Sequence, residues 1–131
     1  MPQLLYLDSS ALVKLVRQEP ETQALLVELE QWPEQATSVV GDIEVRRVAW
    51  REGVTERVEA VLAELSLVKL DHPIRELAGR VGSPSLRSLD AVHLASALSL
   101  GDDLGAFCCY DRRLAADAEA AGLAVVSPGL A

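Results

Sequence analysis

The sequence has little of several residue types, and each shortage excludes a class of protein. It has two cysteines, Cys108 and Cys109, which are adjacent, so no CxxC pair is available for zinc or redox chemistry. They lie in GAFCCYD, a strand-like stretch in which neighbouring side chains point to opposite faces. We therefore expect two buried free thiols rather than a disulfide.

Basic residues are also few, and long apolar runs are missing. The chain has 12 Lys and Arg against 20 Asp and Glu, which gives a net charge of −8. This charge argues against nucleic-acid binding through a broad basic surface, although it allows a small local basic rim. No apolar run reaches the roughly 20 residues of a membrane span. The N-terminal MPQLLYLD lacks the basic region of a signal peptide, so we expect a cytoplasmic protein with no membrane contact.

Short apolar runs alternate with helical patterns along the 131 residues, half of which are hydrophobic. Buried strands are predicted at residues 4–7, 36–40, 67–70, 106–110 and 123–127. Helices are predicted to begin near Ser9 or Ser10, Thr22, Gly41 and Asp42, Val54, Asp71, Ser88 and Asp111. Apolar strands with helices between them are typical of a parallel sheet that is covered on both sides. The pattern thus predicts one α/β domain over residues 1–131.

Four carboxylates fall beside the ends of these runs. Asp8 follows the first strand and Asp111 follows the fourth, at the strand ends where open α/β sheets build their sites. Glu44 lies just past the second strand, and Asp90 begins a strongly apolar helix. Each has an ordinary structural explanation. Asp8 and Asp111 can be N-caps, Asp90 can complement its helix dipole, and Glu44 can pair with Arg47.

Taken together, the four acids also indicate a metal site. Converging ionised carboxylates repel one another and are costly to bury unless a cation lies among them. Oxygen ligands without a Cys or His cluster favour Mg²⁺ or Mn²⁺ over zinc. Such an ion suits phosphoryl chemistry, because it can polarise a phosphate, activate a water and stabilise the departing oxygen.

Other residues near the acids have two interpretations each. His93, three residues after Asp90 on the same helix, is either a partner of the site or a hydrogen-bonded core residue. Arginines flank three of the acids: Arg46, Arg47, Arg51, Arg87, Arg112 and Arg113. They form either a phosphate-binding rim or surface salt bridges. Asp42 is predicted to cap its helix. Trp32 and Trp50 either stack on bases or pack at a helix end or dimer contact.

Four segments resemble the PIN-domain ribonucleases, and most closely the VapC toxins of bacterial and archaeal toxin–antitoxin pairs. They are YLDSSALVKL, TSVVGDIEVRRVAW, LRSLDAVHLASAL and YDRRLAADAEAAGLAVVSP, in this order and at appropriate spacing. The resemblance runs over essentially the whole chain. It implies a three-layer α/β/α sandwich around a central parallel sheet of about five strands.

The resemblance also implies an activity, a site and partners. The family's acidic quartet would map onto Asp8, Glu44, Asp90 and Asp111, with Asp8 and Asp90 as the main metal ligands. The activity would be Mg²⁺- or Mn²⁺-dependent endoribonuclease cleavage by a metal-activated water, which leaves a 5′-phosphate on the downstream fragment. The partners would be an RNA substrate such as tRNA, a VapB-type antitoxin and a second copy in a homodimer. The apolar face of the helical segment 9–29 is a candidate dimer or antitoxin surface, although core packing explains it as well.

One departure from the family and two alternative functions stay open. Many relatives have Thr or Ser before the tyrosine of the last motif, whereas this chain has Cys109, whose thiol is a weaker hydrogen-bond donor. The first alternative is a PIN-like domain that binds RNA or protein without cutting. The second is a receiver-like phosphate-accepting domain. Receiver domains need a lysine after a late strand, which neither Lys14 nor Lys69 provides.

Overall fold

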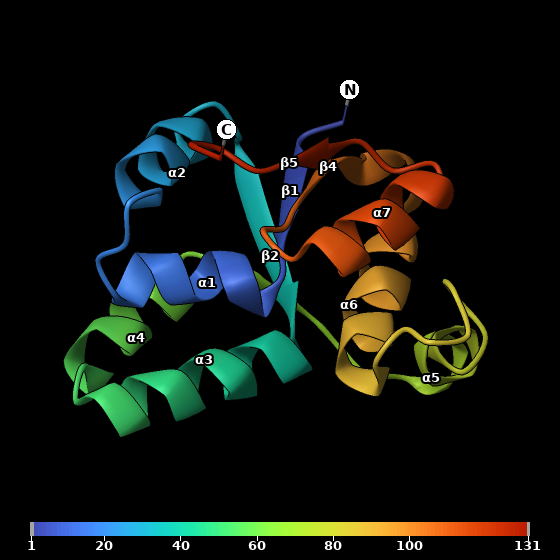
Figure 1. Ribbon diagram of the computed structural model, residues 1–131, viewed down its shortest axis with the longest axis horizontal. Coiled ribbons are helices and arrows are strands. Elements are labelled where there is room, and N and C mark those ends of the chain that lie inside the picture. The colour runs from blue at the N-terminus through green and yellow to red at the C-terminus, as the bar shows by residue number, and fades with distance from the viewer. Residues whose placement is uncertain (1, 131) are drawn as a thin grey trace.

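The computed structural model describes residues 2–130, whose strands form one parallel sheet in the order β3-β2-β1-β4-β5 (Figure 1). The strands are β1 (Leu4–Leu7), β2 (Glu34–Ser38), β3 (Ser66–Val68), β4 (Leu104–Cys108) and β5 (Val125–Val126). In register, Leu5 of β1 pairs with Gln35 of β2 on one side and Ala106 of β4 on the other. The strand order reverses direction at β1, and such a switch point is where open α/β sheets bind ligands beyond the carboxyl ends of their strands.

Helices cover both faces of this sheet. They are α1 (Ser9–Val16), α2 (Thr22–Leu29), α3 (Val39–Glu52), α4 (Thr55–Ala63), α5 (His72–Ala78), α6 (Ser88–Leu98), the 3₁₀ turn η1 (Gly101–Asp103) and α7 (Arg112–Ala120). Figure 1 shows α1 to α4 on one side of the sheet and α5 to α7 on the other. The predicted three-layer α/β/α sandwich is therefore confirmed. None of the described helices is long and apolar enough to cross a membrane.

Alternating strand residues divide the buried side chains into two cores. Leu5 and Leu7 pack with residues of α1 to α4, whereas Tyr6 packs with residues of α6 and α7. The adjacent cysteines also point to opposite faces. Cys108 packs in the core beneath α1 to α4, and Cys109 packs in the core beneath α6 and α7. Both thiols are buried and free, as the sequence predicted. Because the central strands bury both faces, they have the continuous apolar runs that are typical of parallel sheets.

The predicted strand 36–40 was wrong at its carboxyl end. β2 ends at Ser38, and the next two residues, Val39 and Val40, form the first turn of α3. The Ser38 hydroxyl accepts a hydrogen bond from the backbone N of Gly41 at 3.0 Å and so caps this helix. The helix therefore begins earlier than predicted. The ends of the three later strands differ from prediction by one or two residues.

The helices α1 and α6 begin at Ser9 and Ser88 as predicted, but these serines do not cap them. The N-cap of α1 is Asp8 rather than Ser9 or Ser10, because its side chain accepts from the backbone N of Ala11. The N-cap position of α6 is Arg87, which makes no side-chain cap hydrogen bond, so Ser88 begins the helix without capping it. The starts at Asp71 and Asp111 are confirmed, since both side chains cap their helices.

Candidate active site

Asp8 lies where β1 passes into α1, and it is 2% exposed. Its Oδ1 accepts hydrogen bonds from the Ser10 hydroxyl at 2.7 Å and from the backbone N of Ala11 at 3.0 Å. Burial raises the pKa of Asp8, and the hydrogen bonds offset this only in part. The capping role is thus confirmed, and it needs only one oxygen of the carboxylate. The cap does not use Oδ2 of Asp8, and a nearby cation would stabilise the ionised form of this buried carboxylate.

Glu44 of α3 is held by residues from two other helices. Its Oε1 accepts a hydrogen bond from the Ser9 hydroxyl at 2.8 Å and lies 2.8 Å from Nε2 of His93. Burial alone would raise the pKa of Glu44, but these hydrogen bonds outweigh it and keep the pKa below its usual value. The partners of this carboxylate are therefore Ser9 and His93 rather than Arg47, which the ordinary explanation had assigned to it.

His93 connects this carboxylate to the core. The imidazole is fully buried, and its Nδ1 lies 2.7 Å from the hydroxyl of Tyr6. Burial raises the pKa of Tyr6, so its hydroxyl keeps its proton and can donate to Nδ1. In the neutral tautomer that satisfies both contacts, Nε2 carries the hydrogen and donates to Glu44. The two interpretations of His93 are therefore compatible, because it is a buried core residue that also contacts a site residue.

Asp90 and Asp111 line one surface hollow of about 420 Å³. Asp90 lies in the first turn of α6, and Asp111 caps α7 by accepting at Oδ1 from the backbone N of Arg113 and Leu114 at 2.9 and 3.1 Å. Burial raises the pKa of Asp90, and the negative charges of Asp111 and Asp8 raise it further. The charges of Asp111 and Asp8 thus lie close enough to disfavour the ionisation of Asp90.

The structure connects the four predicted acids without forming a finished ligand cage. Asp90 shares the hollow with Asp111 and is coupled to Asp8 by charge, while Glu44 is linked to the same helix as Asp90 through His93. Within residues 2–130, no group of three or more His, Cys, Asp or Glu side chains has the geometry of a preformed metal site. Mg²⁺ is commonly held by one or two carboxylates together with waters and phosphate oxygens. The oxygen donors and the repulsion around Asp90 fit an ion held in that way.

Three residues at the site were missed by the sequence interpretation. Ser9 and Ser10 were considered only as helix caps, yet Ser9 donates to Glu44 and Ser10 donates to Asp8. The signal was their position, directly after the first acid. The contact of Tyr6 with His93 spans 87 positions, and no local pattern distinguishes this tyrosine from the other buried residues of its strand.

The segment after β4 is held by hydrogen bonds on both sides. The Cys109 thiol donates to the backbone carbonyl of Asp111 at 3.3 Å, and the Ser127 hydroxyl donates to the carbonyl of Cys109 at 2.6 Å. The backbone N of Tyr110 donates to the Ser10 hydroxyl at 2.9 Å. The weak thiol donor is therefore one of several contacts that position Asp111.

The flanking arginines do not all have the same role. Arg46 pairs with Asp42 at 2.6 Å and with Glu59, so the salt-bridge interpretation holds for it. Asp42 is therefore an ion-pair partner, and its predicted role as a helix cap was wrong. In contrast, Arg87 and Arg113 line the hollow that contains the two aspartates.

The two tryptophans also differ. The indole Nε1 of Trp32 donates to Glu28 at 2.9 Å, and its ring covers Gly105, where an added Cβ would lie 2.2 Å from the ring. Trp32 is thus a packing residue. Trp50 is 72% exposed on α3.

An open parallel sheet with acids beyond its strand ends is compatible with phosphoryl-transfer chemistry, and comparisons with known proteins identify the family. The PIN domain family model matches residues 5–126. Ribonuclease VapC47 of Mycobacterium tuberculosis is 41% identical over 133 residues, which cover 96% of this chain and 98% of the relative. Ribonuclease VapC35 of the same organism is 43% identical over 135 residues, which cover 98% and 99%. The chain therefore belongs to the PIN-domain family.

Solved structures agree with this assignment in fold. The crystal structure of M. tuberculosis VapC20, described as a toxin that cleaves the sarcin-ricin loop, matches with a TM-score of 0.73 and 18% identity, over 95% of this chain and 99% of that chain. A toxin–antitoxin complex from Klebsiella pneumoniae also has a TM-score of 0.73, with 21% identity over 95% and 97%. The resemblance seen in the sequence is confirmed. The receiver-like alternative is not supported, and Lys14 is instead ion-paired with Glu19 and Glu21 at 2.8 and 2.6 Å.

Proposed function

We propose that this protein is a divalent-metal-dependent endoribonuclease and the toxin of a toxin–antitoxin pair, with residues 1–131 acting as one cytoplasmic domain. The observation that carries the proposal is the placement of the acids in a PIN-domain fold, where Asp8 follows β1 and Asp90 and Asp111 line one hollow. Asp8 is buried and Asp90 and Asp111 are half-buried, so repulsion among them is costly, and a divalent cation would remove it. The relatives named ribonucleases support RNA as the substrate.

Each acid has a role in this proposal. Asp8 and Asp90 would be the main ligands of Mg²⁺ or Mn²⁺, and Glu44 and Asp111 would complete the site directly or through water. The bound ion would polarise the scissile phosphate and lower the pKa of a water. Glu44 keeps a low pKa through Ser9 and His93, so it is ionised at neutral pH and can orient that water.

The test is cleavage of end-labelled total tRNA and of a long unstructured RNA with Mg²⁺ or Mn²⁺, compared with EDTA and with Asp90→Asn. Metal-dependent fragments with 5′-phosphates, lost in the variant, are the expected result. Absence of both cleavage and Mn²⁺ binding by calorimetry would favour the alternative of a catalytically silent binding domain.

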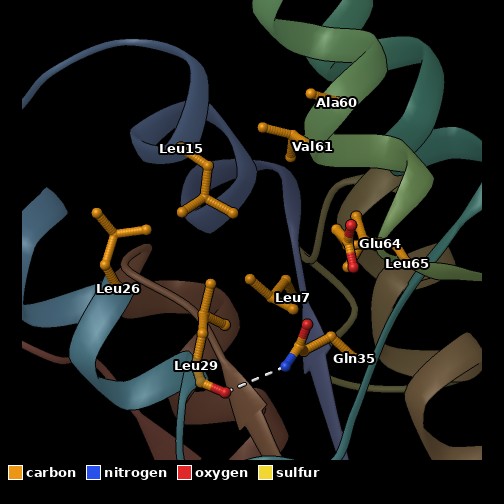
Figure 2. Close-up of a pocket in the computed structure, with 9 residues that line it drawn as sticks. All are labelled: Leu7, Leu15, Leu26, Leu29, Gln35, Ala60, Val61, Glu64 and Leu65. Carbon is orange, nitrogen blue, oxygen red and sulfur yellow. Dashed lines mark hydrogen bonds between the residues drawn. The ribbon is translucent and has the colours of Figure 1, made fainter.

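An antitoxin partner agrees with the neighbours solved as toxin–antitoxin complexes, and an apolar groove offers it a surface (Figure 2). The groove measures about 310 Å³ and is lined mainly by apolar side chains of α1, α2 and α4, with Leu7 of β1 beneath them. Leu26 at its edge is 42% exposed. An amphipathic antitoxin helix would bury this surface, so Leu26→Glu should weaken retention of a co-expressed cognate antitoxin while leaving RNA cleavage intact.

A homodimer is the second assembly that we propose. Ile43 and Trp50 lie two helical turns apart on α3, and they are 59% and 72% exposed. Large apolar side chains on one helix face are typical of a protein contact. Sedimentation equilibrium should show a dimer that Trp50→Glu converts to a monomer, and a monomeric unmodified protein would contradict the assignment.

A further inference from the structure

The hollow that contains Asp90 and Asp111 extends beyond these acids to α7 and to the loop at residues 82–86. Its other walls are made by Ser83, Ser85, Leu86, Arg87, Arg113, Ala116 and Asp117. We propose that this hollow is the subsite for a nucleotide of the RNA next to the scissile bond, with Arg87 and Arg113 contacting its phosphates. This inference rests on the proposed ribonuclease function.

The two arginines are available for an anionic ligand. Among residues 2–130, neither Arg87 nor Arg113 forms an ion pair, whereas Arg46 forms two. They enter the hollow from different elements, since Arg87 precedes α6 and Arg113 lies in the first turn of α7. The hollow is therefore a place where a protein of net charge −8 presents two unpaired guanidinium groups beside its proposed catalytic acids. Guanidinium groups bind phosphate oxygens with two parallel hydrogen bonds.

The wall formed by Ser83 and Asp117 is suited to the sugar and base rather than to a phosphate. Ser83 donates to Oδ2 of Asp117 at 3.0 Å, so this wall has hydroxyls and a carboxylate that can accept from a 2′-OH or a base N–H. The carboxylate would repel a phosphate. Leu86 and Ala116 add apolar surface to the same hollow. The hollow therefore offers guanidinium groups to the phosphates of a nucleotide, and hydroxyl, carboxylate and apolar groups to its sugar or base.

The loop that forms this wall has a fixed shape. Gly82 has φ +75°, and an added Cβ would lie 2.7 Å from Leu86 and 3.4 Å from Asp117. A turn hydrogen bond from the backbone N of Leu86 to the carbonyl of Ser83 measures 3.0 Å. The wall is thus held against α7 before any ligand binds, which reduces the entropy that binding would cost. A volume of about 420 Å³ lies within the range of small-ligand sites.

The test compares Arg87→Gln and Arg113→Gln with Arg112→Gln. Arg112 is the matched control, because it is exposed, adjacent to Arg113 and carries the same charge, but it does not line the hollow. Binding of a fluorescein-labelled, mixed-sequence, single-stranded 12-nucleotide RNA is measured by anisotropy with Mg²⁺, in an Asp8→Asn background that prevents cleavage. We expect Arg87→Gln and Arg113→Gln each to weaken binding about 3- to 10-fold and to reduce the salt slope by about 0.7, as one lost phosphate contact predicts. Equal losses in all three variants would overturn the subsite, because they would reflect net charge alone.

A steric variant tests the hollow without changing charge. Ala116→Phe fills the hollow from an exposed position on α7, and Ala120→Phe is the control on the same helix outside it. We expect only Ala116→Phe to weaken RNA binding, and no difference between the two would overturn the proposal. Cleavage of total tRNA by the unmodified protein is measured in parallel. If cleavage fails while the hollow variants still lose RNA binding, the proposed nuclease function is wrong and the hollow is an RNA-binding site with no scissile bond beside it.

Discussion

Nε2 of His93 lies 2.8 Å from Oε1 of Glu44, and the other ring nitrogen of His93 lies 2.7 Å from the hydroxyl of Tyr6. Tyr6 in turn stacks on Phe107, with ring centroids 5.4 Å apart. Through His93, the orientation of the Glu44 carboxylate thus depends on Tyr6 and Phe107, which lie in the core between the sheet and the helices α6 and α7. Partners that orient metal-ligating groups in this way commonly affect metal affinity and activity when they are changed.

His93→Ala should therefore reduce activity beyond any loss of stability. We expect Mn²⁺ affinity or kcat to fall about 10- to 100-fold, as is usual for loss of a residue that orients a metal ligand. His93→Gln, which keeps a side-chain N–H donor, should retain more of both. Calorimetric Mn²⁺ titration and single-turnover cleavage would check this, with circular dichroism to establish folding. If folded His93→Ala has unchanged Mn²⁺ affinity, His93 contributes to core packing and does not position the metal site.

Asp8→Asn and Asp8→Ala separate the capping role from the proposed metal role. Both changes should abolish cleavage. Asn caps a helix about as well as Asp, whereas Ala loses the cap at a cost of about 1 kcal/mol. Because Asn also removes a buried charge, Asp8→Asn should be more stable than the unmodified protein in EDTA at pH 7, and Asp8→Ala should be less stable than Asp8→Asn. Urea denaturation would rank the free energies of unfolding of the unmodified protein and the two variants. If Asp8→Asn retains full cleavage, Asp8 is not part of the site.

The stability of the metal-free protein should depend on pH with a defined sign. The pKa values of Asp8 and Asp90 are raised in the folded state, so this state holds protons that the unfolded chain has lost. Their contribution is present below the unfolded carboxyl pKa of about 4 and is lost as the pH rises through the raised values. Glu44, with its lowered pKa, acts oppositely and only at more acidic pH. Urea denaturation in EDTA should show stability falling as the pH rises above about 4, and Asp8→Asn should show a flatter profile.

A divalent metal ion should restore the stability that the metal-free protein loses as the pH rises. A ligand that binds only the folded state adds about 2.7 kcal/mol at 100 times its dissociation constant. We expect Mn²⁺ to raise the midpoint of thermal unfolding at pH 7 in the unmodified protein and to have little effect in Asp90→Asn. An equal rise in both proteins would show that the ion binds elsewhere.

The sequence predicted the layers and the positions of the acids at the sheet edge because both depend on local patterns. Apolar runs such as 4–7 are too short for a helix, and an acid directly after such a run lies at the carboxyl edge of a parallel sheet. The end of β2 was mispredicted because Val39 and Val40 have strand propensity, which the Ser38 cap overrides. The connection from Tyr6 through His93 to Glu44 joins three elements that are distant in sequence, so it depends on tertiary packing that no periodicity encodes.

Gly41 provides a last test of the packing between α3 and His93. A Cβ at this position would lie 2.3 Å from the Thr37 hydroxyl and 3.1 Å from Cε1 of His93, and both of these side chains are fully buried. Gly41→Ala must therefore displace α3 or the imidazole, so we expect loss of both stability and cleavage. Gly53→Ala is the control at the other end of α3, because it strains a φ of +72° at a cost of about 1 kcal/mol but contacts nothing within 4 Å. Cleavage per folded molecule should fall only in Gly41→Ala, and an equal fall in both variants would mean that the contact with His93 does not position the site.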